Sequence, residues 1–183
     1  MKIEEANKLL AEADLLVTES EVAAAIKRMA EEITVRLKDS NPLLLCVMNG
    51  GLIFGGHLLT RLHFPLEFEY IHATRYGHDS KGLDLNWIVK PKSQLHGRTV
   101  LLLDDILDEG ITLAAIADYC RSQGASVVLM AALVEKLHLR KVTPGMRADF
   151  TGIEVGDRFL FGFGLDYKGY WRNAPGIYAV KGK

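Results

Sequence analysis

The apolar positions along the chain follow two patterns, and each predicts a different kind of element. Between residues 18 and 37 they recur every three or four positions, which is the period of an amphipathic helix. Thr18 and Glu21 have the spacing of a capping box, so this helix is predicted to begin next to Thr18. Pro42 predicts where it ends, because the residue before a proline disfavours helical backbone. A shorter helix is predicted over residues 3–11.

Continuous apolar runs alternate with the helical segments, and they predict strands that are buried on both faces. The predicted strands cover residues 43–48, 66–74, 99–103 and 126–134, and the helices between them cover residues 52–62 and 112–123. Strands that alternate with helices indicate parallel pairing with right-handed connections. The predicted fold class is therefore α/β, with a parallel sheet core flanked by helices.

Two segments lack a strong period. Residues 76–92 are rich in Gly, Asp, Ser and Lys, and we expect a long mobile loop with some hairpin character. Residues 149–180 mix short apolar pieces with Gly, Asp and Tyr, which is typical of a small lobe, or hood. We interpret residues 1–183 as one domain, with a core over about 18–148 and a hood formed by the N-terminal residues and about 149–183.

Composition and charge narrow the classes of function. The formal net charge of −1 argues against a broad nucleic-acid or membrane surface, so we expect neither partner. The acidic N-terminal segment does not resemble a secretory signal, and no apolar run is long enough to span a bilayer, so a cytoplasmic protein is expected. Cys46 and Cys120 lie far apart in apolar segments and are predicted to be buried, reduced thiols.

The most informative segment is an acidic turn between a strand and a helix, with the sequence VLLLDDILDEGITL over residues 100–113. The predicted strand delivers Asp104 and Asp105 at its carboxyl end, where open α/β sheets bind ligands. Gly110 permits a tight turn, and the next helix begins with free backbone amides that suit a phosphate group. Carboxylates on one side and amides on the other suit a sugar phosphate with free hydroxyls. The alternative interpretation is that both aspartates only solvate the end of the strand.

The complete pattern resembles the phosphoribosyl pyrophosphate signature of the type I phosphoribosyltransferases. Residues 48–51, MNGG, look like the pyrophosphate-binding loop of that family, and Lys136 looks like the lysine that recognises the 6-oxo group of a purine. Residues 157–160, 164–167 and 170–173, which read DRFL, GLDY and YWRN, resemble the hood of hypoxanthine-guanine phosphoribosyltransferases. The resemblance covers almost the whole chain in matching order, and it implies the type I phosphoribosyltransferase fold.

The resemblance assigns the phosphoribosyl pyrophosphate site residue by residue. Asp104 and Asp105 would orient the ribose hydroxyls, directly or through Mg²⁺, and Asp108 would be the general base that takes the purine N7 proton. The 5′-phosphate would lie against the backbone amides of Asp108, Glu109, Gly110, Ile111 and Thr112. Asn49, Gly50, Gly51 and Arg172 would contact pyrophosphate. The implied cofactor is Mg²⁺, with Asp104, Asp105 and Asp166 as its protein ligands.

The purine site is implied in the same way. Phe159 would stack on the base, the Leu160 backbone would bind its edge, and Lys136 and Asp166 would complete the site. Each assignment has a plainer alternative, since Phe159 is also compatible with a core position, Lys136 with a solvated lysine and Arg172 with a surface ion pair.

The chain departs from the family's commoner residues at a few positions. Asn49 stands where relatives often have lysine, and Glu109 stands where many have threonine. The mobile loop opens with Arg75-Tyr76 instead of Ser-Tyr, and we expect this pair to act as a lid. In the family, the peptide before the position of Asn49 can be cis, which the sequence alone does not determine here.

The predicted function is transfer of a phosphoribosyl group from phosphoribosyl pyrophosphate to hypoxanthine or guanine in purine salvage. The predicted assembly is a homodimer or homotetramer. The alternative is a non-catalytic regulator that uses the same fold to sense nucleotides, for which a basic face or an added DNA-binding domain would be expected.

A P-loop NTPase is excluded because no GxxxxGK[ST] sequence occurs. A phosphoacceptor signalling domain would need a further Asp at the end of another core strand, and those strands end in Met48-Asn49 and Val134-Glu135.

Overall fold

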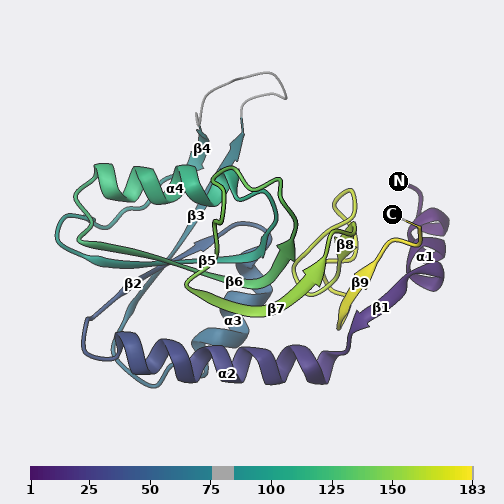
Figure 1. Cartoon of the computed structure of the whole chain (residues 1–183), viewed down its shortest axis with the longest axis horizontal. Coiled ribbons are helices and arrows are strands. Elements are labelled where there is room, and N and C mark those ends of the chain that lie inside the picture. Colours follow the sequence, from purple (N-terminus) through teal and green to yellow (C-terminus); the bar gives the residue numbers. More distant parts are fainter. Residues whose placement is uncertain (76–84, 183) are drawn as a thin grey trace.

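Two sheets organise the computed structural model, which describes residues 1–75 and 85–182 (Figure 1). The larger sheet has six strands in the order β4-β3-β2-β5-β6-β7. Their bounds are β2 Leu43–Val47, β3 Glu67–Arg75, β4 Leu85–Val89, β5 Thr99–Leu107, β6 Val127–Leu137 and β7 Phe150–Gly156. All neighbours pair in parallel except β3 and β4, which are antiparallel. The predicted α/β class with a parallel sheet core is confirmed.

Helices cover both faces of this sheet, so its central strands β2 and β5 are buried on both sides. Helices α2 (Glu19–Leu37) and α3 (Gly51–Leu59) pack on one face, and α4 (Ile111–Ser122) packs on the other (Figure 1). Successive residues of β5 alternate between the two cores: Leu101 and Leu103 face α2 and α3, whereas Val100 and Leu102 face α4. This alternation explains why the sequence shows continuous apolar runs instead of a polar–apolar pattern.

The capping box predicted at Thr18 is present. The Thr18 side chain accepts a hydrogen bond from the Glu21 backbone amide at 3.3 Å, and Glu21 accepts one from the Thr18 amide at 2.8 Å. The predicted buried thiols are also present, since Cys46 and Cys120 are both free and buried. Burial raises the pKa of Cys46 to about 12, so this thiol stays protonated at neutral pH.

The smaller sheet has the order β1-β9-β8 and lies beside α1 (Ile3–Glu12), with both chain termini nearby (Figure 1). Its strands are β1 Asp14–Val17, β8 Leu160–Phe161 and β9 Ile177–Ala179. The Trp171 indole N–H donates to the Ala6 carbonyl at 2.7 Å, which joins the C-terminal segment to α1. The N-terminal and C-terminal segments therefore form one lobe, which we call the hood.

The hood begins later in the sequence than the predicted boundary near residue 149. Strand β7 belongs to the large sheet, where it pairs with β6 and packs against α2. The buried residues of β7 are Phe150, Gly152 and Val155, and this irregular apolar pattern gives a weak sequence signal for a strand. Strand β4 lies inside the predicted loop 76–92 and supplies its hairpin character, whereas residues 76–84 lie outside the described part of the chain. No helix among the described residues is long and apolar enough to cross a membrane.

Candidate active site

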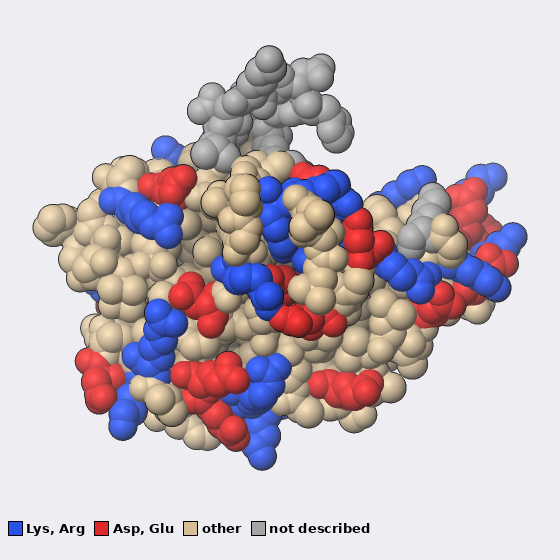
Figure 2. All heavy atoms as spheres, viewed as in Figure 1, with Lys and Arg blue, Asp and Glu red and all other residues tan. Residues whose placement is uncertain are grey.

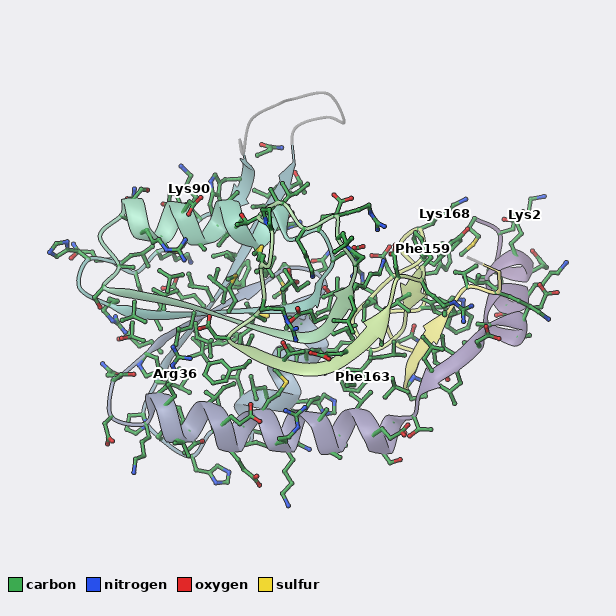
Figure 3. All side chains as sticks on the ribbon, in the orientation of Figure 1. Lys2, Arg36, Lys90, Phe159, Phe163 and Lys168 are labelled. Carbon is green, nitrogen blue, oxygen red and sulfur yellow. The ribbon has the colours of Figure 1, made fainter. Side chains whose placement is uncertain are left out.

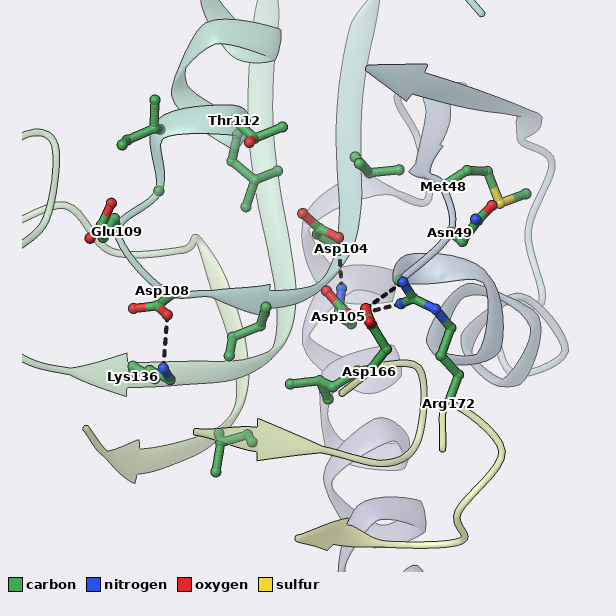
Figure 4. Close-up of a pocket in the computed structure, with 18 of the residues that line it drawn as sticks. Met48, Asn49, Asp104, Asp105, Asp108, Glu109, Thr112, Lys136, Asp166 and Arg172 are labelled. Atoms are coloured by element: carbon green, nitrogen blue, oxygen red, sulfur yellow. Dashed lines mark hydrogen bonds and ion pairs between the residues drawn. The ribbon is translucent and has the colours of Figure 1, made fainter. Parts of the chain in front are cut away.

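A pocket of about 510 Å³ opens at the carboxyl ends of the central strands, beside the hood (Figure 4). Most of the site residues predicted from the sequence line it. They are Asn49, Gly50, Asp104, Asp105, Asp108, Glu109, Gly110, Ile111, Thr112, Lys136, Phe159, Leu160, Asp166 and Arg172. Gly51 is instead buried at the start of α3, against the Leu103 carbonyl. Arg75 is the last residue of β3, and Tyr76 lies outside the described residues, so their lid role stays a prediction.

One end of the pocket is the turn between β5 and α4, where the sequence predicts phosphate binding. Gly110 has a φ of +79°, in the left-handed region that favours glycine, and it lies against the Met146 side chain. Helix α4 begins at Ile111, and its first intrahelical amide bond runs from Ala114 to the Gly110 carbonyl at 2.8 Å. The amides that precede Ala114 have no helical partner, so they are oriented to bind an anion.

Asp108 is held on both of its carboxylate oxygens. Lys136 Nζ donates to Oδ2 at 2.8 Å, and His138 Nε2 lies 2.7 Å from Oδ1. Burial acts to raise the pKa of Asp108, but the hydrogen bonds and charges of Lys136 and His138 outweigh it and lower that pKa. Asp108 is therefore ionised at neutral pH. Lys136 is only 7% exposed, which excludes the interpretation that it is a solvated lysine.

His138 and Arg140 were not identified from the sequence. Lys136 lies on β6, which extends beyond the predicted end at residue 134, and His138 and Arg140 follow at two-residue intervals. That spacing places alternate side chains on one side of an extended chain, and it was the available sequence signal. Arg140 pairs with both carboxylate oxygens of Asp157, and Asp157 lies 3.9 Å from Lys136 Nζ.

The opposite end of the pocket gathers three carboxylates around one arginine. Arg172 Nη2 lies 2.5 Å from Asp166 Oδ1, and Nη1 lies 3.9 Å from Asp105 Oδ2 (Figure 4). Asp104 Oδ1 accepts the Asp105 backbone N–H at 3.0 Å. Burial raises the pKa of both Asp104 and Asp105, and the negative charge of Asp105 raises that of Asp104 further. Arg172 is thus part of the pocket, not a remote surface ion pair.

Close backbone packing holds the hood against this acidic end. Gly164 has a φ of +108°, and a Cβ there would lie 2.5 Å from the Gly50 carbonyl. A Cβ on Gly50 would overlap the Asp105 carboxylate. Arg172 Nη1 donates to the Gly164 carbonyl at 2.6 Å. The glycines of the Met48–Gly51 loop and the hood therefore allow a contact that a side chain would prevent.

Other residues of the pocket have defined places. The Met48–Asn49 peptide is cis, and Asn49 lines the pocket. Phe159 is 47% exposed and stands in the hood with its ring edge-on to Tyr167, so it is not a core residue (Figure 3). Leu160 is buried at the start of β8.

One group of described side chains has three donor atoms close enough to share a metal ion. Donor atoms of Asp108, His138 and Asp157 lie within 4.8 Å of one another. Lys136 and Arg140 already supply positive charge there. In the group formed by Asp104, Asp105 and Asp166, the positive charge that the described residues supply comes from Arg172, and burial disfavours the charged forms of Asp104 and Asp105. The negative charge at the acidic end is therefore less compensated, and Mg²⁺ binding there stays a prediction.

A parallel sheet with free helix amides and carboxylates at its strand ends is typical of α/β proteins that bind phosphorylated ligands there. The chain belongs to the phosphoribosyltransferase family, because residues 13–168 match the phosphoribosyl transferase domain.

Relatives of similar length support this membership. The chain is 32% identical over 168 residues to the hypoxanthine-guanine phosphoribosyltransferase of Bacillus subtilis, covering 91% of this chain and 92% of that protein. It is 34% identical over 169 residues to the protein of the same name from Aquifex aeolicus, covering 91% and 94%. The crystal structure of a hypoxanthine phosphoribosyltransferase from Staphylococcus aureus superposes with a TM-score of 0.88 over 95% of each chain, at 23% identity. At that identity the superposition shows the shared type I phosphoribosyltransferase fold.

Proposed function

We propose that the chain transfers the 5-phosphoribosyl group of phosphoribosyl pyrophosphate to hypoxanthine or guanine, and so makes IMP or GMP and pyrophosphate in purine salvage. The observation that carries the proposal is the Lys136–Asp108 pair, whose donor and acceptor atoms lie 2.8 Å apart at the pocket wall. A 6-oxopurine has an acceptor, O6, next to a donor, N7–H. The pair is complementary to that edge, whereas the 6-amino group of adenine would meet Lys136 donor to donor.

The rest of the pocket fits phosphoribosyl pyrophosphate. The amides at the start of α4 would bind the 5′-phosphate, with the Thr112 hydroxyl beside them. Asp104 and Asp105 would accept hydrogen bonds from the ribose hydroxyls. Arg172, Asn49 and Gly50 would bind the pyrophosphate, which places the ribose between the two phosphate sites.

The carboxylates of Asp104, Asp105 and Asp166 are suited to hold Mg²⁺. The raised pKa values of Asp104 and Asp105 mean that their charged forms are disfavoured without a further cation, and Arg172 is the positive side chain that acts against this shift. When bound, Mg²⁺ supplies neutralisation of the negative charge on the leaving pyrophosphate. The chain's part is to keep these carboxylates at one edge of the site, where Gly50 and Gly164 allow the hood to approach.

Purine binding would redistribute the hydrogen bonds of Asp108. Lys136 would pass from Asp108 Oδ2 to the purine O6, and Oδ2 would then be free to accept the N7 proton. Loss of the Lys136 hydrogen bond removes a cause of the lowered pKa, so the carboxylate becomes more basic when the substrate is in place. Phe159 would stack on the base, and the Leu160 backbone would bind its edge.

The rival function is a nucleotide-sensing regulator without catalysis. On the face shown in Figure 2, basic and acidic side chains are interspersed, and the formal net charge is −1. Asp108 and Lys136 also stand together at the pocket wall, as catalysis of the transfer would require. The discriminating experiment mixes the protein with hypoxanthine, phosphoribosyl pyrophosphate and Mg²⁺ and measures pyrophosphate. Catalytic release supports the enzyme, and stoichiometric binding without release supports the regulator.

We further propose that the protein works in the cytoplasm as a homodimer or homotetramer. Strand β3 exposes Phe68 and Tyr70, which are 41% and 47% accessible, and an apolar surface of this kind favours association. Light scattering after size exclusion should give a multiple of the mass of one chain. A monomer at micromolar concentration would contradict the proposed assembly.

A further inference from the structure

His138 contacts Asp108, the proposed base, and the reaction proposed for the chain assigns this contact no role. Its side chain is only 5% exposed, and its two ring nitrogens have different partners. Nδ1 accepts a hydrogen bond from the Arg140 backbone N–H at 3.0 Å, and Nε2 lies 2.7 Å from Asp108 Oδ1. A neutral imidazole carries one proton, and a nitrogen that accepts cannot carry it. The proton therefore lies on Nε2, which donates to Asp108.

This hydrogen bond matters most when the purine enters. Asp108 has two carboxylate oxygens, with His138 on Oδ1 and Lys136 on Oδ2. A 6-oxopurine would draw Lys136 to O6 and place N7–H at Oδ2. Of these two donors to Asp108, only His138 would then remain in place.

We propose that His138 is a positioning residue, which fixes Asp108 Oδ1 so that Oδ2 faces the purine N7. This inference rests on the proposed transferase function and assigns His138 a part in it. Arg140 is not a substitute for His138, because its guanidinium pairs with both oxygens of Asp157 and comes no closer than 3.9 Å to Asp108 Oδ1.

The backbone of the turn is held independently of His138. Lys141 Nζ donates to the Leu107 carbonyl at 2.8 Å, and the Val142 amide donates to the Glu109 carbonyl at 2.8 Å. These bonds secure both neighbours of Asp108. Replacing His138 should consequently free the Asp108 side chain without displacing the phosphate-binding amides.

The experiment compares His138→Ala, His138→Gln and the control Leu139→Ala. Leu139 is fully exposed in the same segment, so its variant reports any general disturbance there. For His138→Ala we expect kcat with guanine to fall about tenfold or more, a fraction of the two to four orders of magnitude that a general base supplies. The KM for phosphoribosyl pyrophosphate should change less than about twofold, since the phosphate contacts are untouched. A glutamine side chain would offer an amide donor in place of the imidazole N–H, so His138→Gln should recover most of the rate.

A second substrate separates positioning from a structural role. The ring proton of 8-azaguanine is more acidic than that of guanine, so its removal depends less on a well-oriented base. The rate loss in His138→Ala should be smaller with 8-azaguanine than with guanine. In an Asp108→Asn background, His138→Ala should cause little further loss.

Several results would overturn the inference. They are an unchanged kcat in His138→Ala, an equal loss with both bases, or a parallel rise in the KM for phosphoribosyl pyrophosphate. If His138→Ala does not fold, a His138→Gln variant that is as slow as Asp108→Asn would also overturn it. Failure of the proposed function is distinct, because the wild-type protein would then form no nucleotide at all.

Discussion

Asp108 and Asp105 lie at the same end of β5, yet their carboxylates are in opposite electrostatic states. Asp108 receives hydrogen bonds from Lys136 and His138, and its pKa is lowered. Asp105 is buried, with Arg172 no closer than 3.9 Å, and its pKa is raised. Two residues of β5, Ile106 and Leu107, separate them, so a charge-balanced site adjoins one with excess negative charge.

The difference suits the two tasks that we propose for one pocket, a general base and a metal site. A base must be ionised and oriented before the substrate arrives, so its partners are supplied by the fold. A metal site must stay open to a cation and a charged substrate, so the fold leaves part of its negative charge unbalanced. Replacement of the carboxylate by an amide should therefore change the stability of the ligand-free protein in opposite directions at the two sites.

The largest expected effect is on catalysis at the balanced site. Asp108→Asn keeps the size of the side chain but removes the base, so kcat should fall by about two to four orders of magnitude. The affinity for phosphoribosyl pyrophosphate, measured by calorimetry, should change little, because amides hold the 5′-phosphate. Near-normal turnover would show that Asp108 is not the base, and complete loss of binding would show that it builds the turn.

Asp105→Asn should affect binding more than the chemical step. Loss of a charged acceptor for a ribose hydroxyl costs about 1.5–3 kcal/mol, which corresponds to a rise of roughly ten- to a hundredfold in the KM for phosphoribosyl pyrophosphate. The ligand-free variant should melt at a higher temperature than the wild type, since a disfavoured buried charge is removed. A lower melting temperature would contradict the excess negative charge inferred for this end of the pocket.

The glycine contact between the hood and the acidic end gives a third comparison. In Gly50→Ala the new methyl group would overlap the Asp105 carboxylate, and overpacking of this kind costs about 1–3 kcal/mol. The matched control is Gly56→Ala, because a Cβ there would meet nothing within 4 Å. Thermal melting and the KM for phosphoribosyl pyrophosphate should worsen only in Gly50→Ala. Equal behaviour of the two variants would mean that the contact is adjustable.

The smallest expected effect is the dependence of stability on pH. A raised folded-state pKa at Asp105 means that the ligand-free protein gains stability as pH falls through that pKa towards the ordinary value of 3.8. A lowered pKa at Asp108 means that its contribution is present above 3.8 and is lost as pH falls further. As the pH is lowered, the melting-temperature difference between Asp105→Asn and wild type should therefore begin to shrink while the pH is still above 3.8. The melting-temperature difference between Asp108→Asn and wild type should persist down to pH 3.8. If this difference shrinks at a higher pH than the difference for Asp105→Asn, the two assigned pKa directions are wrong.

Local patterns in the sequence were enough to predict the sheet core and the acidic turn. The β5 strand, Gly110 and helix α4 are adjacent in the chain, and each has its own signal. The strands of the hood were not predicted individually, because β1 and β9 are short and pair across almost the full length of the chain.

The contacts around Asp108 were missed for a related reason. His138 and Asp108 are 30 residues apart, and only the pairing of β5 with β6 brings them together. A two-residue alternation after Lys136 was visible, but the sequence does not show which strand end it would face. The opposite pKa shifts of Asp105 and Asp108 likewise depend on burial and on partners that no local pattern specifies.

The most direct test of the account compares hypoxanthine with adenine in one steady-state assay of nucleotide formation with phosphoribosyl pyrophosphate and Mg²⁺. Lys136 is buried and donates, so it complements a 6-oxo group and leaves a 6-amino group without an acceptor. We expect IMP formation with hypoxanthine and a kcat/KM for adenine that is lower by several orders of magnitude, because unpaired buried donors discriminate on the order of 10⁴-fold or more. Equal turnover of the two bases would contradict it.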